Sequence, residues 1–449
     1  MKILLISANT LTSPYPVYPL GLDYVANAIG ADHQVKIADM NDVGNYDSLG
    51  NIIRHFSPDI IGMSLRNADN TDTSDPRGFV GNYQELTAAI REYSDARLVL
   101  GGSGFTIFPA EFMKVLKADY GIIGEGERLA LLLNALEKQE DVANIPGVIT
   151  RDTEAHIPAP WDNSYFRNFD PESSHLRFYL RKGGMLNLQT KRGCQFKCIY
   201  CTYPHIEGKT LRCIPPNEVA ETGLRLQNAG AKYFFVTDSA FNADYSHSIE
   251  VARAFIKAGV SVPWGAFFTP TNPPEDYYRI LADAGLTHVE FGTDSLSDAI
   301  LASYGKPFRA DHVFNAHQSA TDAGLYVAHY FLLGGPGENE YSLNETLSGV
   351  DKLDKSVLFF FCGMRIYPYT AIYDIAMKAG QISEGRNLLN PLFYQSESVH
   401  SEVIIQRVGE QAKGHINWII GSGGEKNAKI LSRMYERGHY GPLWEHLIR

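Results

Sequence analysis

The chain has 449 residues, of which 44% are hydrophobic and 20% charged, an ordinary balance for a globular protein long enough to form two or three domains. Its 40 lysines and arginines against 51 aspartates and glutamates give a formal net charge of −11. This balance argues against a nucleic-acid partner, because such binding depends on basic patches.

The N-terminal segment and the cysteines indicate the compartment. The apolar run 3–6 is followed by polar Ser7, so it is too short for a signal-peptide core or a membrane span. Five cysteines, three of them clustered, argue for a reducing compartment rather than a disulfide framework. We therefore expect a cytoplasmic protein without a membrane span.

Residues 1–145 alternate between apolar strands and helices. Strands are predicted at 2–7, 33–38, 59–64 and 97–100, with helices at 21–29 and 83–93. Continuous apolar strands separated by helices predict a parallel, Rossmann-like sheet covered on both faces. Ligands of such sheets bind beyond the carboxyl ends of the strands, where Ser64, Gly101 and Gly102 stand. Glycines there either let the backbone approach a flat, bulky ligand or serve only tight turns.

A connector and a second repeat follow. Residues 146–182 are irregular and are predicted to be a linker. Residues 183–385 alternate strands with helices, and the strands are predicted at 186–190, 233–237, 264–268, 288–292, 326–333 and 357–366. This spacing predicts an α/β fold, a six-stranded partial (β/α)6 barrel of the TIM type with its chemistry at the carboxyl ends of the strands. Residues 386–449 are expected to form a small, mainly helical C-terminal region over the open side of the barrel.

Three cysteines follow the first barrel strand closely. Cys194, Cys198 and Cys201 are spaced C-x-x-x-C-x-x-C, and soft thiolates of this kind select iron–sulfur clusters or zinc. A 4Fe-4S cube has four irons, so three thiolates leave one iron open for an outside ligand. The alternative is a zinc-stabilised binding module without catalysis. A structural zinc site usually needs four protein ligands in two close pairs, whereas Cys213 and Cys362 stand alone.

The cysteine spacing resembles the signature of the radical S-adenosylmethionine (SAM) superfamily. The resemblance implies a 4Fe-4S cluster whose open iron chelates the amino and carboxylate groups of SAM, and whose electron cleaves SAM to a 5′-deoxyadenosyl radical. The resemblance also implies these SAM-binding positions: Tyr200 against adenine, Asp238 and Ser239 in place of the usual Gly-Gly-Glu segment, Asp294 and Ser295 near the ribose, and Gly334 in a loop whose backbone pairs with adenine. Asp238 and Ser295 could instead be the N-caps of the helices that follow them. Lys306 either pairs with the SAM carboxylate or is merely solvated.

Residues 1–145 resemble the cobalamin-binding domain found ahead of many radical SAM cores. The resemblance is carried by the segments 19–22, 64–65, 101–103 and 124–127, which are rich in glycine at strand and helix ends. The D-x-H-x-x-G loop that supplies a histidine to cobalt in other cobalamin proteins is missing after Ser7. The resemblance therefore implies either cobalamin held without a protein ligand below the cobalt, or a domain kept without its cofactor.

Two activities follow from these resemblances. The first is cobalamin-dependent methylation of an unactivated carbon of a small molecule, lipid or natural product, in which one SAM recharges cobalamin and a second supplies the radical. The alternative is radical dehydration or rearrangement, for example of a sugar diol, with an N-terminal domain that no longer binds cobalamin. Both activities imply a small-molecule substrate and an external flavodoxin- or ferredoxin-like electron donor.

Overall fold

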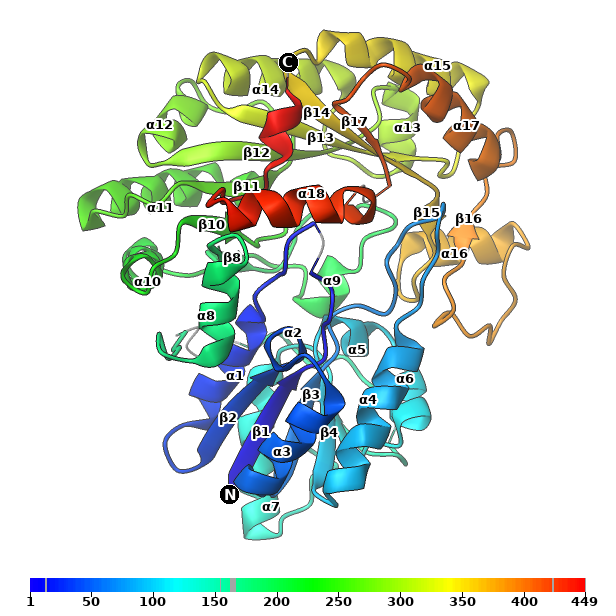
Figure 1. The fold of residues 1–449 in the computed structure, drawn as a ribbon. Helices are drawn as coiled ribbons and strands as arrows, with labels where there is room; N and C mark the ends of the chain where they lie inside the picture. The colour runs from blue at the N-terminus through cyan, green and yellow to red at the C-terminus, as the bar shows by residue number, and fades with distance from the viewer. Residues whose placement is uncertain (13, 154, 162–166, 422–423, 449) are drawn as a thin grey trace.

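The computed structural model describes the chain except residues 13, 154, 162–166, 422–423 and 449. Figure 1 shows two layered α/β bodies, the N-terminal sheet (blue to cyan) below and the barrel sheet (green to yellow) above. Helices flank both sheets, and the two sheets form the framework of the fold.

The N-terminal sheet has six strands in the order β2-β1-β3-β4-β5-β6. All neighbours pair in parallel except β5 and β6, which are antiparallel. This arrangement confirms the predicted Rossmann-like parallel sheet. The strands are β1 Lys2–Ser7, β2 Gln34–Asp39, β3 Ile60–Ser64, β4 Arg97–Gly101, β5 Tyr120–Ile122 and β6 Val148–Ile149.

Helices cover both faces of this sheet because successive strand residues point to opposite sides. Leu4 and Ile61 pack against α3, α4 and α6 in one cluster, whereas Leu5 and Ile60 pack against α1 and α7 in another. The helices are α1 Leu20–Ile29, α3 Tyr46–Phe56, α4 Val80–Tyr93, α6 Pro109–Leu116 and α7 Leu129–Lys138.

The barrel sheet has seven parallel strands in the order β17-β14-β13-β12-β11-β10-β7. The six predicted strands are confirmed, and β17 adds a seventh from the C-terminal region, which we expected to be mainly helical. The sheet stays open between β17 and β7. The strands are β7 Met185–Leu188, β10 Tyr233–Val236, β11 Trp264–Phe268, β12 Leu286–Asp294, β13 Tyr326–Leu333, β14 Ser356–Cys362 and β17 Trp418–Ile420.

Helices lie on the outer face of the barrel sheet, and the C-terminal segment lies on its inner face. Phe360 packs with the outer helices, whereas its neighbour Phe359 packs with Trp444 inside. The helices of this half of the chain include α10 Pro216–Asn228, α11 Tyr245–Ala258, α12 Tyr277–Asp283, α14 Ala310–Asp322, α15 Glu340–Gly349, α17 Ser401–Gln411 and α18 Gly424–Glu436. The remaining elements are α2 Met40–Val43, α5 Ser103–Ile107, α8 Ser174–Arg181, α9 Tyr203–Ile206, α13 Asp298–Ser303, α16 Ala371–Lys378, the antiparallel strand pairs β8 Lys191–Arg192 with β9 Arg212–Cys213 and β15 Met364–Arg365 with β16 Phe393–Tyr394, and the 3-10 turns η1 Gly126–Arg128, η2 Phe241–Ala243, η3 Val350–Lys352 and η4 Trp444–Leu447.

Buried ion pairs join the two bodies. Asp23 of α1 pairs with Arg167 of the connector at 2.8 Å, and Asp69 of the β3–α4 loop pairs with Arg365 of β15 at 2.9 Å. All four side chains are at most 4% exposed, so each charge depends on its partner for compensation. The two domains are therefore held in one arrangement around the space between them. In the part of the chain that the structure describes, no helix combines the length and apolarity needed to cross a bilayer.

Candidate functional site

A cavity of about 1070 Å³ lies between the two domains. Its lower wall is formed by the carboxyl ends of the N-terminal strands, where the predicted Ser64, Gly101 and Gly102 all line it. Its upper wall includes Thr237 and Phe267 at the ends of barrel strands. The carboxyl ends of both sheets thus open into one space, as parallel α/β sheets favour for ligand sites.

The cavity continues as a slot along the N-terminal sheet, and glycines make room for it. Gly62 lies in the middle of β3 and lines the slot with Leu5 and Leu129. A Cβ at Gly62 would come within 2.9 Å of Leu5 Cδ2. Gly102 has φ +98°, and a Cβ there would lie 2.7 Å from the Leu65 carbonyl oxygen. Gly102 is therefore required by the backbone itself, and Gly62 keeps the slot open.

The polar groups of the lower cavity fit an amide-rich ligand such as cobalamin. Asn9 is 9% exposed and lines the cavity, and its Nδ2 has no hydrogen-bond partner. A buried donor left unpaired is costly, which indicates that a bound group completes it. Among the described residues, the cavity is lined by no histidine. No imidazole of the described residues therefore faces a ligand in this part of the cavity.

The cysteine loop is held by backbone contacts. Cys194 N donates to the Gly208 carbonyl at 3.1 Å, and Cys201 N donates to the Cys198 carbonyl at 3.2 Å. Burial raises the pKa of the Cys201 thiol to about 12. A bound metal must therefore supply the positive charge that keeps this sulfur deprotonated.

The three thiols suit a cluster better than a single ion. Burial and the charges of Cys198 and Cys194 both act on the Cys201 thiol, so the three sulfurs share one region. Within the described ranges, no three histidine, cysteine or carboxylate side chains converge on a point that one metal ion could fill. In a cube each thiolate binds its own iron, so convergence on one point is not required. A closed tetrahedral zinc site would require it.

Two of the predicted SAM-binding residues meet beside this loop. The Tyr200 hydroxyl donates to Asp294 Oδ2 at 2.6 Å, and Asp294 ends β12 with φ +61° after a bulge in the pairing with β13. Lys306 Nζ lies 2.9 Å from the same carboxylate oxygen and 3.1 Å from the Tyr200 oxygen. Lys306 is thus not merely solvated, because it pairs with Asp294.

Asp238 and Ser239 form polar contacts with residues 190–193, the segment that leads into the cysteine loop. Asp238 pairs with Lys191 Nζ at 2.8 Å, both side chains being fully buried, and accepts from the Thr190 amide at 2.8 Å. Ser239 Oγ donates to the Gly193 carbonyl at 3.0 Å. The next helix, α11, is capped by Asp244, so the N-cap alternative for Asp238 is wrong.

Ser295 and Gly334 lie at strand ends and are buried. Ser295 is fully buried and hydrogen-bonded to Thr346 at 2.9 Å, and α13 is preceded by Ser297 rather than by Ser295. Gly334 has φ +89° and donates its N–H to Glu338 Oε2 at 3.3 Å. None of the six predicted SAM contacts lines the cavity, which makes their roles a proposal: Tyr200, Asp238, Ser239, Asp294, Ser295 and Gly334.

Two further features of the cavity had no assigned role in the sequence. Glu207, six residues beyond Cys201, lines the cavity and accepts from the Gly193 amide at 3.0 Å, and burial raises its pKa to about 7. Its position shortly after the cysteines was the one available signal. The β3–α4 loop, residues 66–77, also lines the cavity. Its contact with the barrel is a tertiary feature that no local pattern indicates.

Comparison with known proteins agrees with both halves of this architecture. A model of the radical SAM superfamily matches residues 188–348, and a model of the B12-binding domain matches residues 6–133. An uncharacterised methyltransferase of Pyrococcus horikoshii is 25% identical over 84% of this chain and 83% of its own length. The tryptophan 2-C-methyltransferase of Streptomyces laurentii is 22% identical over 90% of this chain and 78% of its own length.

The fold is also that of a solved structure. The radical SAM methyltransferase TsrM of Kitasatospora setae, solved with cobalamin and a 4Fe-4S cluster, superposes with a TM-score of 0.89 at 21% identity, over 99% of this chain and 97% of that one. The two matching families account for the cysteine loop at the barrel mouth and for the sheet below it. The chain accordingly is an enzyme that combines a radical SAM domain with an N-terminal B12-binding domain.

Proposed function

We propose that this enzyme uses SAM, a 4Fe-4S cluster and cobalamin to methylate an unactivated carbon of a small molecule. The observation that carries the proposal is the single cavity onto which both the cobalamin-type strand ends and the barrel mouth open. A cofactor resting on Ser64, Gly101 and Gly102 would face the barrel across this cavity. Both relatives compared above carry the name of methyltransferases, which supports the same reaction class.

The protein's own groups bind and orient the reacting parts. Cys194, Cys198 and Cys201 would hold the cluster, whose chemistry is the supply of one electron to SAM, while cobalamin supplies a carrier for the methyl group. Tyr200 and Asp294 would lie next to SAM, and Asp238 and Ser239 would fix the loop that carries the cysteines. The buried ion pairs between the domains would hold the two walls of the cavity in a fixed arrangement.

The upper wall of the cavity supports a small organic substrate. Phe267 is 39% exposed there, and its ring packs edge-on against Phe235 at 5.0 Å between centroids. Asn187, 5% exposed, also lines the cavity from β7. An apolar wall with a few placed polar groups is the usual character of a small-molecule site.

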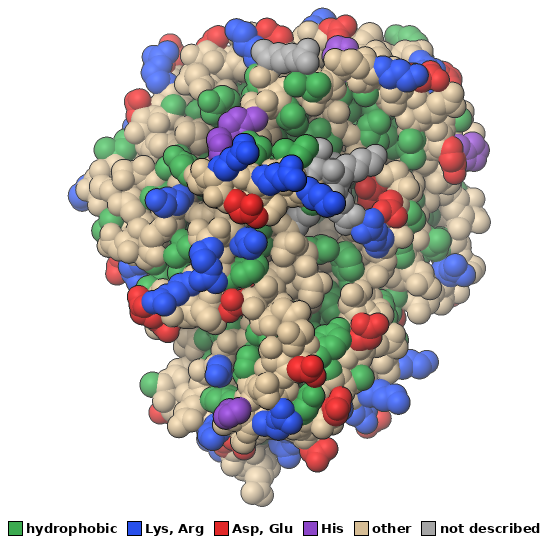
Figure 2. Space-filling view, in the orientation of Figure 1, with side chains coloured by type: hydrophobic (Ala, Val, Ile, Leu, Met, Phe, Trp, Pro, Cys, Tyr) green, Lys and Arg blue, Asp and Glu red, His purple; other side chains and the backbone are tan. Residues whose placement is uncertain are grey.

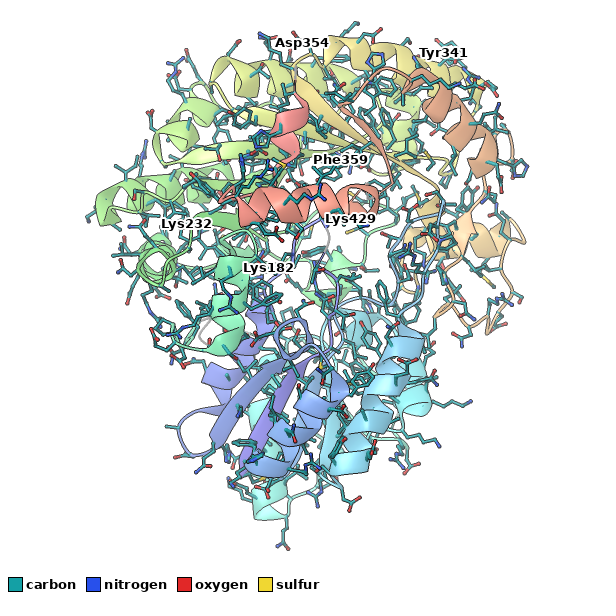
Figure 3. The ribbon with its side chains drawn as sticks, in the orientation of Figure 1. Lys182, Lys232, Tyr341, Asp354, Phe359 and Lys429 are labelled. Carbon is teal, nitrogen blue, oxygen red and sulfur yellow. The ribbon has the colours of Figure 1, made fainter. Side chains whose placement is uncertain are left out.

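We further propose a cytoplasmic enzyme that receives its electron from a flavodoxin- or ferredoxin-like protein. Figure 2 shows lysine and arginine side chains gathered over the middle of one face. Lys182, Lys232 and Lys429, labelled in Figure 3, are exposed around α8 and α18 on this face. A basic face on an acidic chain complements an acidic partner.

We also propose a division of the chain into domains 1–145, 183–385 and 386–449, with a linker at 146–182.

The test is anaerobic purification with cobalamin supplied, followed by incubation with SAM labelled in its methyl group and a small-molecule extract of the source cells. We expect cobalamin to copurify and one small molecule to gain the labelled methyl. Turnover by cobalamin-free protein, with a product that has lost water or is an isomer of its substrate, would establish the dehydration or rearrangement alternative instead.

A further inference from the structure

Backbone contacts place Lys306 directly beside the cysteine loop. α13 ends at Ser303, and the Tyr304 carbonyl accepts from the Ile199 amide at 3.1 Å. Gly305 follows with φ +70°, and a Cβ there would lie 2.5 Å from the Lys197 carbonyl oxygen. Only glycine fits this turn. The next residue, Lys306, therefore starts from a fixed point directly beside the segment that contains Cys198.

The Lys306 side chain carries a lasting positive charge into this site. It is 7% exposed and pairs with Asp294 at 2.9 Å. Burial acts to lower its pKa, but the Asp294 carboxylate and the sulfurs of Cys198 and Cys201 together outweigh burial, and the pKa is raised above its ordinary value. The ammonium group is thus fully protonated at neutral pH.

This charge lies beside the loop of the cluster ligands. Lys306 Nζ is 3.1 Å from the hydroxyl oxygen of Tyr200, which stands between Cys198 and Cys201, and Asp294 accepts a hydrogen bond from the same hydroxyl at 2.6 Å. The ammonium of Lys306 thus stabilises negative charge at this loop, and the carboxylate of Asp294 destabilises it. Hydrogen bonds to the sulfurs and nearby charges are among the factors that set the reduction potential of an iron–sulfur cluster.

We propose that Lys306 is a positioning residue that raises the reduction potential of the cluster, and that Asp294 lowers it, so that the buried pair sets the potential at which the cluster accepts an electron. An electron added to the cluster makes it more negative, and the ammonium beside Cys198 stabilises that extra charge. The inference rests on the cluster of the proposed function, bound by Cys194, Cys198 and Cys201.

The test is a potentiometric titration of the anaerobically reconstituted enzyme, read by electron paramagnetic resonance. Lys306→Gln should shift the midpoint potential to a more negative value, and Asp294→Asn should shift it to a more positive value. Tyr200→Phe removes a hydrogen bond to Asp294 without changing charge, so its midpoint should stay close to that of the wild type. Lys232 is an exposed lysine before β10, so Lys232→Gln is the matched control for loss of one positive charge, and its midpoint potential should match that of the wild type.

Opposite shifts are the decisive result, because a merely structural role would open the cluster to water in both variants and move both midpoints the same way. Equal midpoints, or shifts in one direction, would overturn the proposal. If the Lys306→Gln variant binds no iron and sulfide, the midpoint potential of Asp294→Asn alone tests the proposal. A midpoint potential of Asp294→Asn that is not more positive than that of the wild type would then overturn it. Wild-type protein without iron and sulfide would instead contradict the proposed function.

Discussion

The three clustered cysteines share one loop, and Cys213 lies outside it, so single substitutions separate the cluster ligands from an unrelated thiol. Cys201→Ala removes one of three thiolates, so we expect loss of most of the iron and sulfide and of SAM cleavage. Anaerobic reconstitution followed by iron and sulfide analysis measures this. Cys213→Ala is the matched control, because Cys213 is exposed and stands outside the loop, and it should keep the full cluster.

Glu290 is a buried carboxyl inside the barrel whose ionisation should weaken the fold. It accepts from Trp444 Nε1 at 3.0 Å and from the Tyr330 hydroxyl at 2.8 Å, yet burial raises its pKa from about 4.5 to about 7. The unfolded chain therefore releases this proton at lower pH than the folded chain does. As pH rises from 4.5 to 7, the folded state holds more protons, and about 3 kcal/mol of stability is lost.

Glu290→Gln should remove this loss, because a neutral amide needs no ionisation and can still pair with both neighbours. Thermal unfolding at a series of pH values measures it, and the melting temperature of the variant should rise relative to the wild type between pH 5 and pH 8. Glu402→Gln, at an exposed glutamate of α17, should track the wild type throughout. A constant difference between Glu290→Gln and the wild type at every pH would contradict the assignment.

At the scale of elements, the β3–α4 loop ties the N-terminal domain to the barrel through Asp69 and Arg365. Removing one member of a buried ion pair leaves an uncompensated charge, so Asp69→Ala or Arg365→Ala should each cost about 3–5 kcal/mol. The double variant should cost clearly less than the sum, because neither charge is left alone. Denaturant unfolding of the four proteins measures the coupling.

The control for this cycle is the exposed pair of Arg407 with Glu340, 2.8 Å apart and 38% and 57% exposed. Arg407→Ala should cost less than about 1 kcal/mol, because water screens such a pair. Additive losses for Asp69 and Arg365 would show that the loop does not depend on this contact.

The elements that the sequence predicted well are those with a strong local pattern. Strands such as β11 and β13 are continuous apolar runs, and the structure places them at their predicted bounds. β17, Trp418–Ile420, was missed because a run of three residues has no readable period, and only pairing with β14 makes it a strand. Asp238 shows the same limit at a site. The sequence predicted that Asp238 lies at the end of a strand. It could not predict the buried ion pair with Lys191, because Lys191 lies 47 positions away in the chain.

At the scale of the whole molecule, the two domains enclose a cavity whose lower slot exists because Gly62 has no side chain. In β3 the neighbours of Gly62 across the sheet are Leu5 and Val99, and the helix α7 residue Leu129 faces them. A valine at this position keeps a good strand former but fills the slot with two methyl groups. The same change leaves the cysteine loop in the other domain untouched.

Gly62→Val should therefore weaken cobalamin binding about tenfold or more, which corresponds to about 1.4 kcal/mol of binding free energy, because the new side chain occupies space in the slot, while iron and sulfide contents stay at the wild-type level. Absorbance titration with hydroxocobalamin measures the affinity for cobalamin. Iron analysis of the same sample shows whether the cysteine loop of the barrel still holds its cluster. Gly81→Ala is the matched glycine control, because a Cβ there meets nothing within 4 Å, and it should bind cobalamin like the wild type. Equal affinity in Gly62→Val and Gly81→Ala would show that the cofactor does not enter the slot. Loss of both cobalamin and iron in Gly62→Val would show instead that the two domains fold as one cooperative unit across the cavity.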